Sequence, residues 1–298
     1  MNKFDELSID INKLFENKDH LNNKISNSNF ILKLLRRYSA AFLLLTKTYE
    51  IFINSGIFLR WFKEFKLYWI EVLHGRPLYF HDFHFLLGIY RQKFQRVATP
   101  ENSSEKEFLD SWQNKDTIYQ LFSAVRRFSY EPLHCYKYES FIKNGDKLLE
   151  YGCGIAPITY SLKNYSVKRD LNFNIADIRQ INSHYAKWRL GTDANFFEIK
   201  PYQNPLKDME NTFDVVFLIT VMEHLPDPLE VVKNIHKSIK KGGLFMFDYI
   251  FSDGEAQDTI EAVRQREEVL EFIKTNFSIK KGNLYISKTI DFAVVQKN

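Results

Sequence analysis

The chain has 298 residues, of which 45% are hydrophobic and 26% charged, and its formal net charge at pH 7 is +4. That length allows one large domain or two ordinary ones. The two cysteines, Cys135 and Cys153, have no paired spacing, which excludes a disulfide framework or a cysteine-based zinc site and favours a reducing cytosol. Residues 1–29 are polar and lack the apolar core of a signal peptide, so we expect a loosely ordered tail and a cytoplasmic protein.

Residues 30–130 have the pattern of a helical module. Apolar residues at four- and three-residue steps predict one buried helix face: Ile57, Trp61, Phe65, Tyr68 and Val72. Gly75 followed by Pro77 predicts the end of that helix. Ser104 with Glu107 three residues later predicts a capping box that opens another helix.

This module is basic. Residues 31–99 hold 11 Lys or Arg and 4 Asp or Glu, a net charge of +7. A solvated helical cap or a homodimer contact accounts for this charge. So does a surface for a phosphate-bearing acceptor or for the anionic inner face of a membrane, and the sequence leaves both open. In the second case Arg36, Arg37, Arg60 and Lys63 would form the contact. The longest apolar stretch carries five charges, which argues against a membrane-spanning helix.

From residue 131 onward the pattern changes to alternating strands and helices. Seven strands are predicted: Lys147–Tyr151, Asn172–Asp177, Asn195–Ile199, Phe213–Thr220, Leu244–Tyr249, Phe277–Lys281 and Thr289–Val295. Helices are predicted at Ile158–Lys163, Ile181–Arg189, Leu229–Lys240 and roughly Glu255–Thr275. The alternation predicts a doubly wound, mostly parallel α/β sheet over residues 131–298, with ligands at the carboxyl ends of its strands.

The turn after the first predicted strand, Gly152-Cys153-Gly154, has the features of a ligand-binding loop. Pro157 suits the first turn of the following helix, and free N–H groups at a helix N-terminus bind polar, often nucleotide-like ligands. A proline in the last position of G-x-G-x-x-G disfavours NAD. A P-loop is excluded because no Gly-Lys-Ser/Thr follows.

The segment Glu150-Tyr-Gly152-Cys-Gly154-Ile-Ala156 resembles the acid-x-G-x-G-x-G motif of class I S-adenosylmethionine-dependent methyltransferases. In that family an acid at the end of the second strand accepts hydrogen bonds from the ribose hydroxyls, and Asp177 stands there. FDVVFLITVMEHLPDPLEVVKNIHKSIKKGGLFMFDYI closely resembles the family's fourth-strand to fifth-strand block. The resemblance covers roughly residues 145–298. It implies the Rossmann-like methyltransferase fold, S-adenosylmethionine as cofactor and activity of the EC 2.1.1 class. The residues that it assigns to the cofactor are Glu150, Gly152, Cys153, Gly154, Asp177, Ile178, Gln203 and Thr220.

Three details of the resemblance bear on the chemistry. His224 follows the fourth strand and could take a proton from an acceptor hydroxyl, although the Glu223-His224 pair could equally fix the loop. Some relatives bind a divalent metal through E-x-x-E-H. Here Thr220 replaces the first acid, so no metal is expected. Many members place an acid after the third strand to bind adenine; Tyr202 stands near that place, so Gln203 or backbone groups are expected to hold the base.

Other candidates have simpler explanations. Asp214 lies at the entrance of its strand and is predicted to be structural, and Cys135 is predicted to be inert. His81 and His84 have a spacing that suits a metal, but no carboxylate–His helix motif surrounds them, so packing or acceptor binding is favoured.

For the whole protein we predict O-methylation of a small-molecule or glycan acceptor. The alternatives are a non-catalytic binding or scaffolding protein that retains the fold, or a methyltransferase acting on RNA or protein. A nucleic-acid partner is not expected, because no RNA-binding signature occurs.

Overall fold

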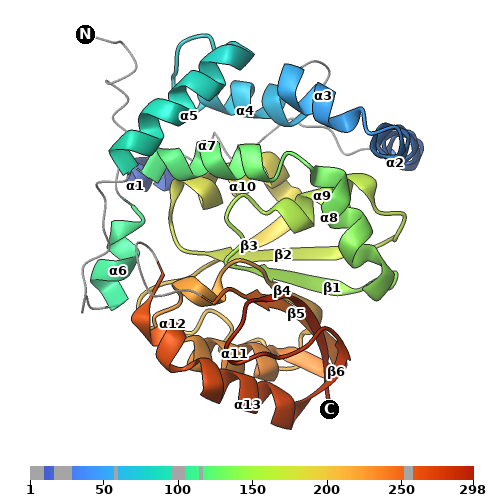
Figure 1. Ribbon diagram of the computed structural model, residues 1–298, viewed down its shortest axis with the longest axis vertical. Coiled ribbons are helices and arrows are strands. Elements are labelled where there is room, and N and C mark those ends of the chain that lie inside the picture. Colours follow the sequence, from blue (N-terminus) through green and yellow to red (C-terminus); the bar gives the residue numbers. More distant parts are fainter. Residues whose placement is uncertain (1–9, 17–28, 57–59, 95–104, 114–116, 252–257) are drawn as a thin grey trace.

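The computed structural model describes residues 10–16, 29–56, 60–94, 105–113, 117–251 and 258–298, and a central seven-stranded sheet organises them (Figure 1). Its strands are β1 (Lys147–Tyr151), β2 (Asn172–Asp177), β3 (Ala194–Glu198), β4 (Phe213–Leu218), β5 (Ile239–Tyr249), β6 (Phe277–Lys281) and β7 (Ile290–Lys297). Their order is β3-β2-β1-β4-β5-β7-β6. The first five strands are parallel, and β7 runs antiparallel to both of its neighbours. The predicted doubly wound, mostly parallel sheet is confirmed.

The strand order reverses between β1 and β4, which pair directly, with Leu148 opposite Val215. From that point the chain winds outward through β2 and β3 on one side and through β5 on the other. The last four residues of β4 are buried, as expected for a central strand that is covered on both faces. Open α/β sheets bind ligands at such a reversal, beyond the carboxyl ends of the strands.

Helices cover both faces of the sheet (Figure 1). One face carries α8 (Glu131–Tyr138), α9 (Pro157–Tyr165) and α10 (Ile181–Leu190), and the other carries α11 (Pro228–Ser238), α12 (Ile260–Arg264) and α13 (Arg266–Asn276). Short 3₁₀ helices are η3 (Glu139–Phe141), η4 (Gly191–Asp193) and η5 (Met222–His224).

The prediction of one helix over Glu255–Thr275 was wrong. The helix is interrupted at Gln265, which caps the end of α12 and the start of α13. Its side-chain oxygen accepts a hydrogen bond from the N–H of Leu229 at 3.1 Å. This bond ties the break to the start of α11. Residues 252–257, which include the predicted start, lie outside the described residues.

The N-terminal module adds a further helical layer over α8–α10 (Figure 1). Before it comes the short helix α1 (Ile11–Glu16), and its own helices are α2 (Phe30–Leu45), α3 (Tyr49–Ser55), α4 (Arg60–Glu71), α5 (Phe80–Phe94), α6 (Glu105–Ser111) and α7 (Ile118–Arg127). The predicted apolar face of α4 is confirmed, because its four described members are buried: Trp61, Phe65, Tyr68 and Val72. α4 ends at Glu71, shortly before Gly75, as predicted. Ile57 and Ser104 lie outside the described residues.

Aromatic rings join the module to the sheet domain. Tyr68 of α4 lies edge-on to Tyr185 and Trp188 of α10, with ring centroids 4.9 and 5.2 Å apart. Phe65 meets Phe122 of α7 at 4.8 Å in the same cluster. Edge-to-face pairs of this kind add to the free energy gained by burying the rings. The aromatic content of 16% therefore serves a core that the module and the sheet domain share.

A buried ionic network crosses the same boundary. The guanidinium of Arg189 in α10 lies 2.7 Å from Glu131 of α8 and 3.6 Å from Glu64 of α4. It stacks on the ring of Tyr160, 3.4 Å from the centroid, and donates to the carbonyl of Ile155 at 3.4 Å. Arg189 thus connects the N-terminal module to the loop that follows β1.

Three of the four basic residues that the phosphate or membrane alternative would use make contacts within the protein. Arg36 donates to Asn164 at 3.2 Å, Arg37 pairs with Glu139 at 2.8 Å, and Arg60 pairs with Glu64 at 2.5 Å and donates to Asn164. Among the four, Lys63 alone is exposed. Arg36, Arg37 and Arg60 thus bind groups of the sheet domain, a role that net charge cannot reveal.

Candidate functional site

A cavity of about 510 Å³ opens where the strand order reverses, and it extends from the sheet to the N-terminal module. All of the site residues predicted from sequence line it: Glu150, Gly152, Cys153, Gly154, Asp177, Ile178, Gln203, Thr220 and His224. A cavity of this size is typical of a small-molecule or cofactor site. The structure therefore brings together side chains that are up to 74 positions apart in the chain.

The two glycines of the loop after β1 serve different purposes. Gly152 and Gly154 both have positive φ, +64° and +52°, which glycine adopts without strain. A Cβ at Gly152 would lie 2.6 Å from Cγ2 of Val221, so this glycine is required by packing inside the protein. A Cβ at Gly154 would meet no protein atom within 4 Å. Gly154 therefore leaves open space in the cavity for close approach of a ligand, whereas Gly152 gives room to Val221.

Glu150 fixes the helix that follows the loop. Its carboxylate accepts hydrogen bonds from the N–H groups of Ile158 and Thr159, at 3.2 and 2.8 Å, at the start of α9. Burial raises the pKa of Glu150 to about 7, while these hydrogen bonds oppose the rise. The carboxylate is thus bonded to helix amides, and Glu150 acts on a ligand chiefly by holding the loop in place.

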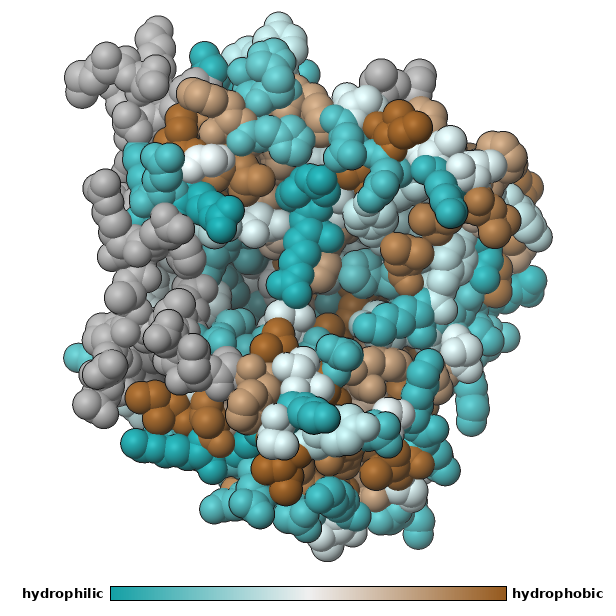
Figure 2. All heavy atoms as spheres, viewed as in Figure 1, coloured by the Kyte–Doolittle hydropathy of each residue, from teal (hydrophilic) through white to brown (hydrophobic). Residues whose placement is uncertain are grey.

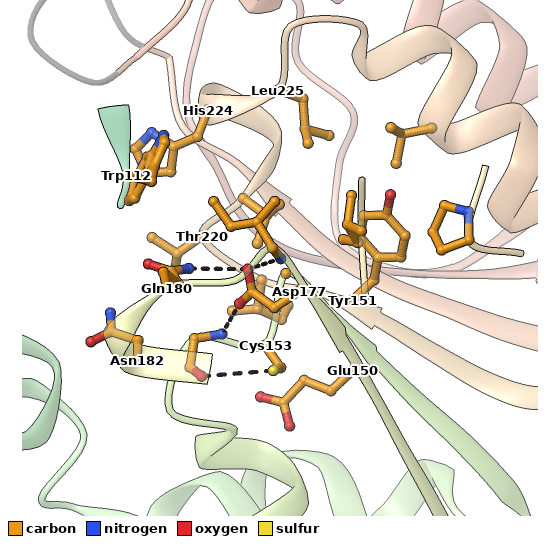
Figure 3. Close-up of a pocket in the computed structure, with 18 of the residues that line it drawn as sticks. Trp112, Glu150, Tyr151, Cys153, Asp177, Gln180, Asn182, Thr220, His224 and Leu225 are labelled. Atoms are coloured by element: carbon orange, nitrogen blue, oxygen red, sulfur yellow. Dashed lines mark hydrogen bonds between the residues drawn. The ribbon is translucent and has the colours of Figure 1, made fainter. Parts of the chain in front are cut away.

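Asp177 occupies the end of β2 and links two loops (Figure 3). One oxygen accepts from the N–H of Gly154 at 2.6 Å; the other accepts from Ile178 N–H at 2.7 Å and from the side-chain amide of Gln180 at 3.0 Å. Burial raises the pKa of Asp177 to about 6. A carboxylate fixed at this point can accept hydrogen bonds from a vicinal diol such as a ribose.

An apolar group lies beside Asp177. Ile178 packs with Ile199 and with Trp112, which follows α6 in the N-terminal module. The Trp112 ring also lies edge-on to His224, with centroids 5.6 Å apart (Figure 3). Flat apolar walls of this kind suit a purine ring. Gln203, the predicted adenine contact, is exposed at the edge of the cavity. Sequence reasoning missed Trp112, since it stands outside every motif.

The end of β4 carries backbone strain. Thr220 has φ +58°, a conformation that a β-branched residue rarely adopts. The carboxylate of Asp248, at the end of β5, holds it there by accepting the Thr220 N–H at 2.6 Å. Residues in such conformations persist only where their surroundings impose them, and they cluster at functional sites.

His224 is paired with an acid that the sequence did not single out. Its Nδ1 lies 2.9 Å from Oδ1 of Asp258, just before α12. The neighbouring Glu223 is buried, and neither of its carboxylate oxygens has a hydrogen-bond partner among the described residues. Burial raises the pKa of Glu223 to about 7, and His224 Nε2 lies 3.8 Å away. Asp258 is 34 positions after His224, so only the fold reveals the pair.

The remaining wall consists of Ala124, Arg127 and Phe128 of the N-terminal module and of His134 of α8. Burial, with the positive charges of Lys137 and Arg127, lowers the pKa of His134 to about 4. This imidazole is therefore neutral at physiological pH. The wall combines an aromatic ring, a neutral imidazole and an exposed guanidinium, and sequence reasoning assigned none of these residues to the site.

Two other candidates lie elsewhere. Asp214 accepts the N–H of Lys147 and pairs with Lys240, each at 2.8 Å, at the opposite edge of the sheet; its predicted structural role is confirmed. His84 packs edge-on against Phe80 at 4.8 Å. Across the described ranges, no group of three or more His, Cys, Asp or Glu side chains has a metal-binding arrangement.

Sheet order, glycine loop and strand-end acid together define a class I S-adenosylmethionine-dependent methyltransferase. The open space at Gly154, the fixed carboxylate of Asp177 and the apolar wall at Ile178 fit this cofactor. The chain belongs to the family described as methyltransferase domain, whose model matches residues 84–281. The match begins within α5, so it includes part of the N-terminal module as well as the sheet domain.

Named relatives act on different acceptors. The sterol 24-C-methyltransferase of Kluyveromyces lactis is 24% identical over 168 residues, which cover 55% of this chain and 45% of the relative. The ubiquinone biosynthesis O-methyltransferase of Pseudomonas syringae is 28% identical over 36% of this chain and 45% of its own. A tRNA U34 carboxymethyltransferase of Campylobacter curvus is 23% identical over 61% of each chain. The chain thus spans less than half the length of the first two.

Among solved structures, a phosphoethanolamine N-methyltransferase 2 of Haemonchus contortus is 19% identical. It covers 61% of this chain and 46% of that chain, with a TM-score of 0.43. A protein of Pyrococcus horikoshii is 15% identical and covers 63% of this chain and 95% of that chain, with a TM-score of 0.41.

Proposed function

We propose that the protein transfers the methyl group of S-adenosylmethionine to a hydroxyl oxygen of a small-molecule or glycan acceptor, with His224 as the general base. The observation that carries the proposal is the His224–Asp258 pair, 2.9 Å apart, on a histidine that lines the cofactor cavity.

The pair prepares the imidazole for proton transfer. When Asp258 accepts the Nδ1–H of His224, this tautomer places the basic lone pair of the neutral ring on the second nitrogen, Nε2, which can accept a proton. An acid partner also stabilises the imidazolium that forms, as in other carboxylate–histidine pairs. An alcohol is a poor nucleophile until it loses its proton, so a base at this point accelerates attack.

The cofactor supplies a methyl group activated by a sulfonium charge. The chain's own contribution is alignment and exclusion of water. Asp177 and the glycine loop fix one side of the cavity, and Phe128 of the N-terminal module lines another. Holding two reactants in line removes much of the entropic barrier of a displacement, and an apolar lining strengthens the electrostatic interactions inside.

Substitutions at the pair test the proposal. His224→Gln should lower kcat by about 10²-fold or more, the usual range for loss of a general base, and Asp258→Asn should have a smaller effect. The affinity for S-adenosylhomocysteine, measured by calorimetry, should remain unchanged. His81→Gln, at a side chain that is 83% exposed, is the matched control. A normal kcat in His224→Gln would rule out the base, and a product methylated on carbon or nitrogen would rule out O-methylation.

We further propose that transfer proceeds without a metal ion. The reason is Thr220, which stands where the metal-dependent pattern E-x-x-E-H carries its first acid. Activity should survive dialysis against EDTA. Loss of activity that Mg²⁺ restores would contradict this part of the proposal.

A further inference from the structure

Helix α2 turns its apolar side toward solvent. Five side chains at steps of four, three, four and three residues form one stripe along it, with exposed fractions from 58% to 83%: Ile31, Leu35, Tyr38, Phe42 and Leu45. We call these five residues the α2 stripe. Figure 2 shows brown and tan side chains gathered over α2 at the upper right of the molecule. Large exposed apolar patches on a folded protein mark contact sites.

The opposite side of α2 explains this inversion. Arg37 pairs with Glu139 and donates to the carbonyl of Tyr165 at 3.0 Å, and Arg36 donates to Asn164. Ala40 is buried on the same side. An amphipathic helix normally buries its apolar face and exposes its charges. In α2 the arginines, together with Leu43 and Leu44 at its C-terminal end, hold the helix on the protein. The apolar stripe is left without a covering element among the described residues.

The composition of the stripe disfavours a second copy of the helix as its cover. Its spacing is that of a coiled-coil seam, but Tyr38 and Phe42 occupy seam positions where paired helices prefer Leu, Ile or Val. The flanking positions carry no charges to choose a partner helix; Leu32, Ser39 and Ala41 stand there. Coiled coils use charges at these positions to set pairing.

The charges around the stripe favour an anionic membrane surface. Helix α2 contains no acidic residue. A basic side chain stands at each end of the stripe: Arg169 lies over the ring of Phe30 at 5.0 Å, and Lys47, two residues beyond Leu45, is exposed. Leu and aromatic side chains between basic residues are typical of helices that lie in the interfacial plane of a bilayer. The long basic side chains can then reach the headgroups.

We propose that the α2 stripe docks the protein on the surface of an anionic bilayer, with the helix parallel to the membrane plane. The stripe is about 21 Å long at 1.5 Å per residue, and its side chains enter the headgroup–acyl boundary. Within the described ranges, no single helix is long and apolar enough to cross a bilayer; one bent pair of helices meets that test only together. The sequence alternative assigned the membrane contact to Arg36 and Arg37 by charge. In this proposal the apolar side of the same helix makes that contact.

Co-sedimentation of the full chain with vesicles tests the proposal. The probes are vesicles of phosphatidylcholine alone and vesicles that contain 30% phosphatidylserine. We expect stronger binding to the second kind. Leu35→Gln/Phe42→Gln should reduce the partition coefficient at least tenfold and leave the affinity for S-adenosylhomocysteine unchanged, which shows that the variant is folded. Leu133→Gln, at a side chain of α8 that is 44% exposed, should bind vesicles as the wild type does.

Light scattering tests whether a second copy of the protein covers the α2 stripe instead. A wild-type dimer that the double variant converts to a monomer would identify the stripe as a contact between copies and overturn the proposal. Absence of vesicle binding by the wild type overturns it as well, and so does equal loss of binding in Leu133→Gln. None of these results depends on methyl transfer, so the membrane proposal and the proposed function can fail independently.

Discussion

The guanidinium of Arg189 and the carboxylate of Glu131 form an ion pair, 2.7 Å apart, in which both side chains are almost completely shielded from solvent. The pair joins α10 to α8. Through the carbonyl of Ile155 the guanidinium also reaches the glycine loop after β1. Because Arg189 also lies 3.6 Å from Glu64 of α4, it links the N-terminal module to the glycine loop.

Replacing Arg189 should be costly. Arg189→Met would leave Glu131 buried without its ion-pair partner, whereas Glu64 would keep Arg60. Loss of one partner of a buried pair typically destabilises by about 3–5 kcal/mol. Urea unfolding measures the loss. Arg179→Met is the control, because the Arg179–Glu198 pair is partly exposed and should contribute only about 0–1 kcal/mol. Equal losses for the two variants would contradict the role given to burial.

The two glycines should respond differently to the same added methyl group. Gly154→Ala should fold, with a loss of roughly 1 kcal/mol for an alanine at positive φ, and should bind S-adenosylhomocysteine much more weakly. Gly152→Ala should destabilise the protein itself, because its Cβ meets Val221. Gly152→Ala/Val221→Ala should recover part of that stability. Thermal denaturation and calorimetry separate the two effects; identical behaviour of the single variants would contradict this division.

Cofactor affinity should depend on pH through Asp177. Burial raises the pKa of this carboxyl to about 6, so in the free protein it is ionised above that pH and protonated below it. The ionised form is a stronger acceptor of hydroxyl hydrogen bonds than the protonated form. Affinity for S-adenosylhomocysteine should therefore be constant above pH 7 and fall as the pH drops below about 6. In Asp177→Asn the affinity should be weaker and should lose this dependence. Tighter binding at pH 5 than at pH 7 would reverse the assigned sign.

Trp112 should contribute to cofactor binding although it belongs to the N-terminal module. Trp112→Ala removes the ring that packs on Ile178 and His224. Stacking of a base on an aromatic side chain contributes about 1–3 kcal/mol, so the dissociation constant should rise at least about fivefold. Trp112→Phe should retain most of the affinity. If Trp112→Ala binds as the wild type does, the ring is a packing element alone.

The sheet and the cofactor loop were predictable because local patterns encode them. Short apolar runs and glycine turns gave all seven strands, and Asp177 followed from its place at the end of β2. Elements defined by distant contacts were not predictable. Asp258 reaches His224 only when α12 is folded against η5. The helix is interrupted at Gln265, whose side chain binds Leu229 of the distant helix α11.

The direction in which charged residues point was also hidden in the sequence. In the sequence Arg37 and Lys63 are both simply basic residues. In the structure Arg37 pairs with Glu139, whereas Lys63 is exposed. Helix periodicity gives the faces of a helix, yet it assumes that the apolar face is buried. In α2 that assumption fails, because its arginines bind polar groups of α9 and η3.

Cys153 lies between the two glycines of the loop, is 3% exposed and has a thiol whose pKa burial raises well above its ordinary value. A thiol in that state reacts with alkylating reagents only while the loop is open. Cys135, the other cysteine of the chain, is also buried, and Cys135→Ser leaves a single thiol at the site. The labelling rate of that thiol then measures how often the loop opens. A cofactor that closes the loop should lower this rate, so occupancy of the site can be measured without any acceptor.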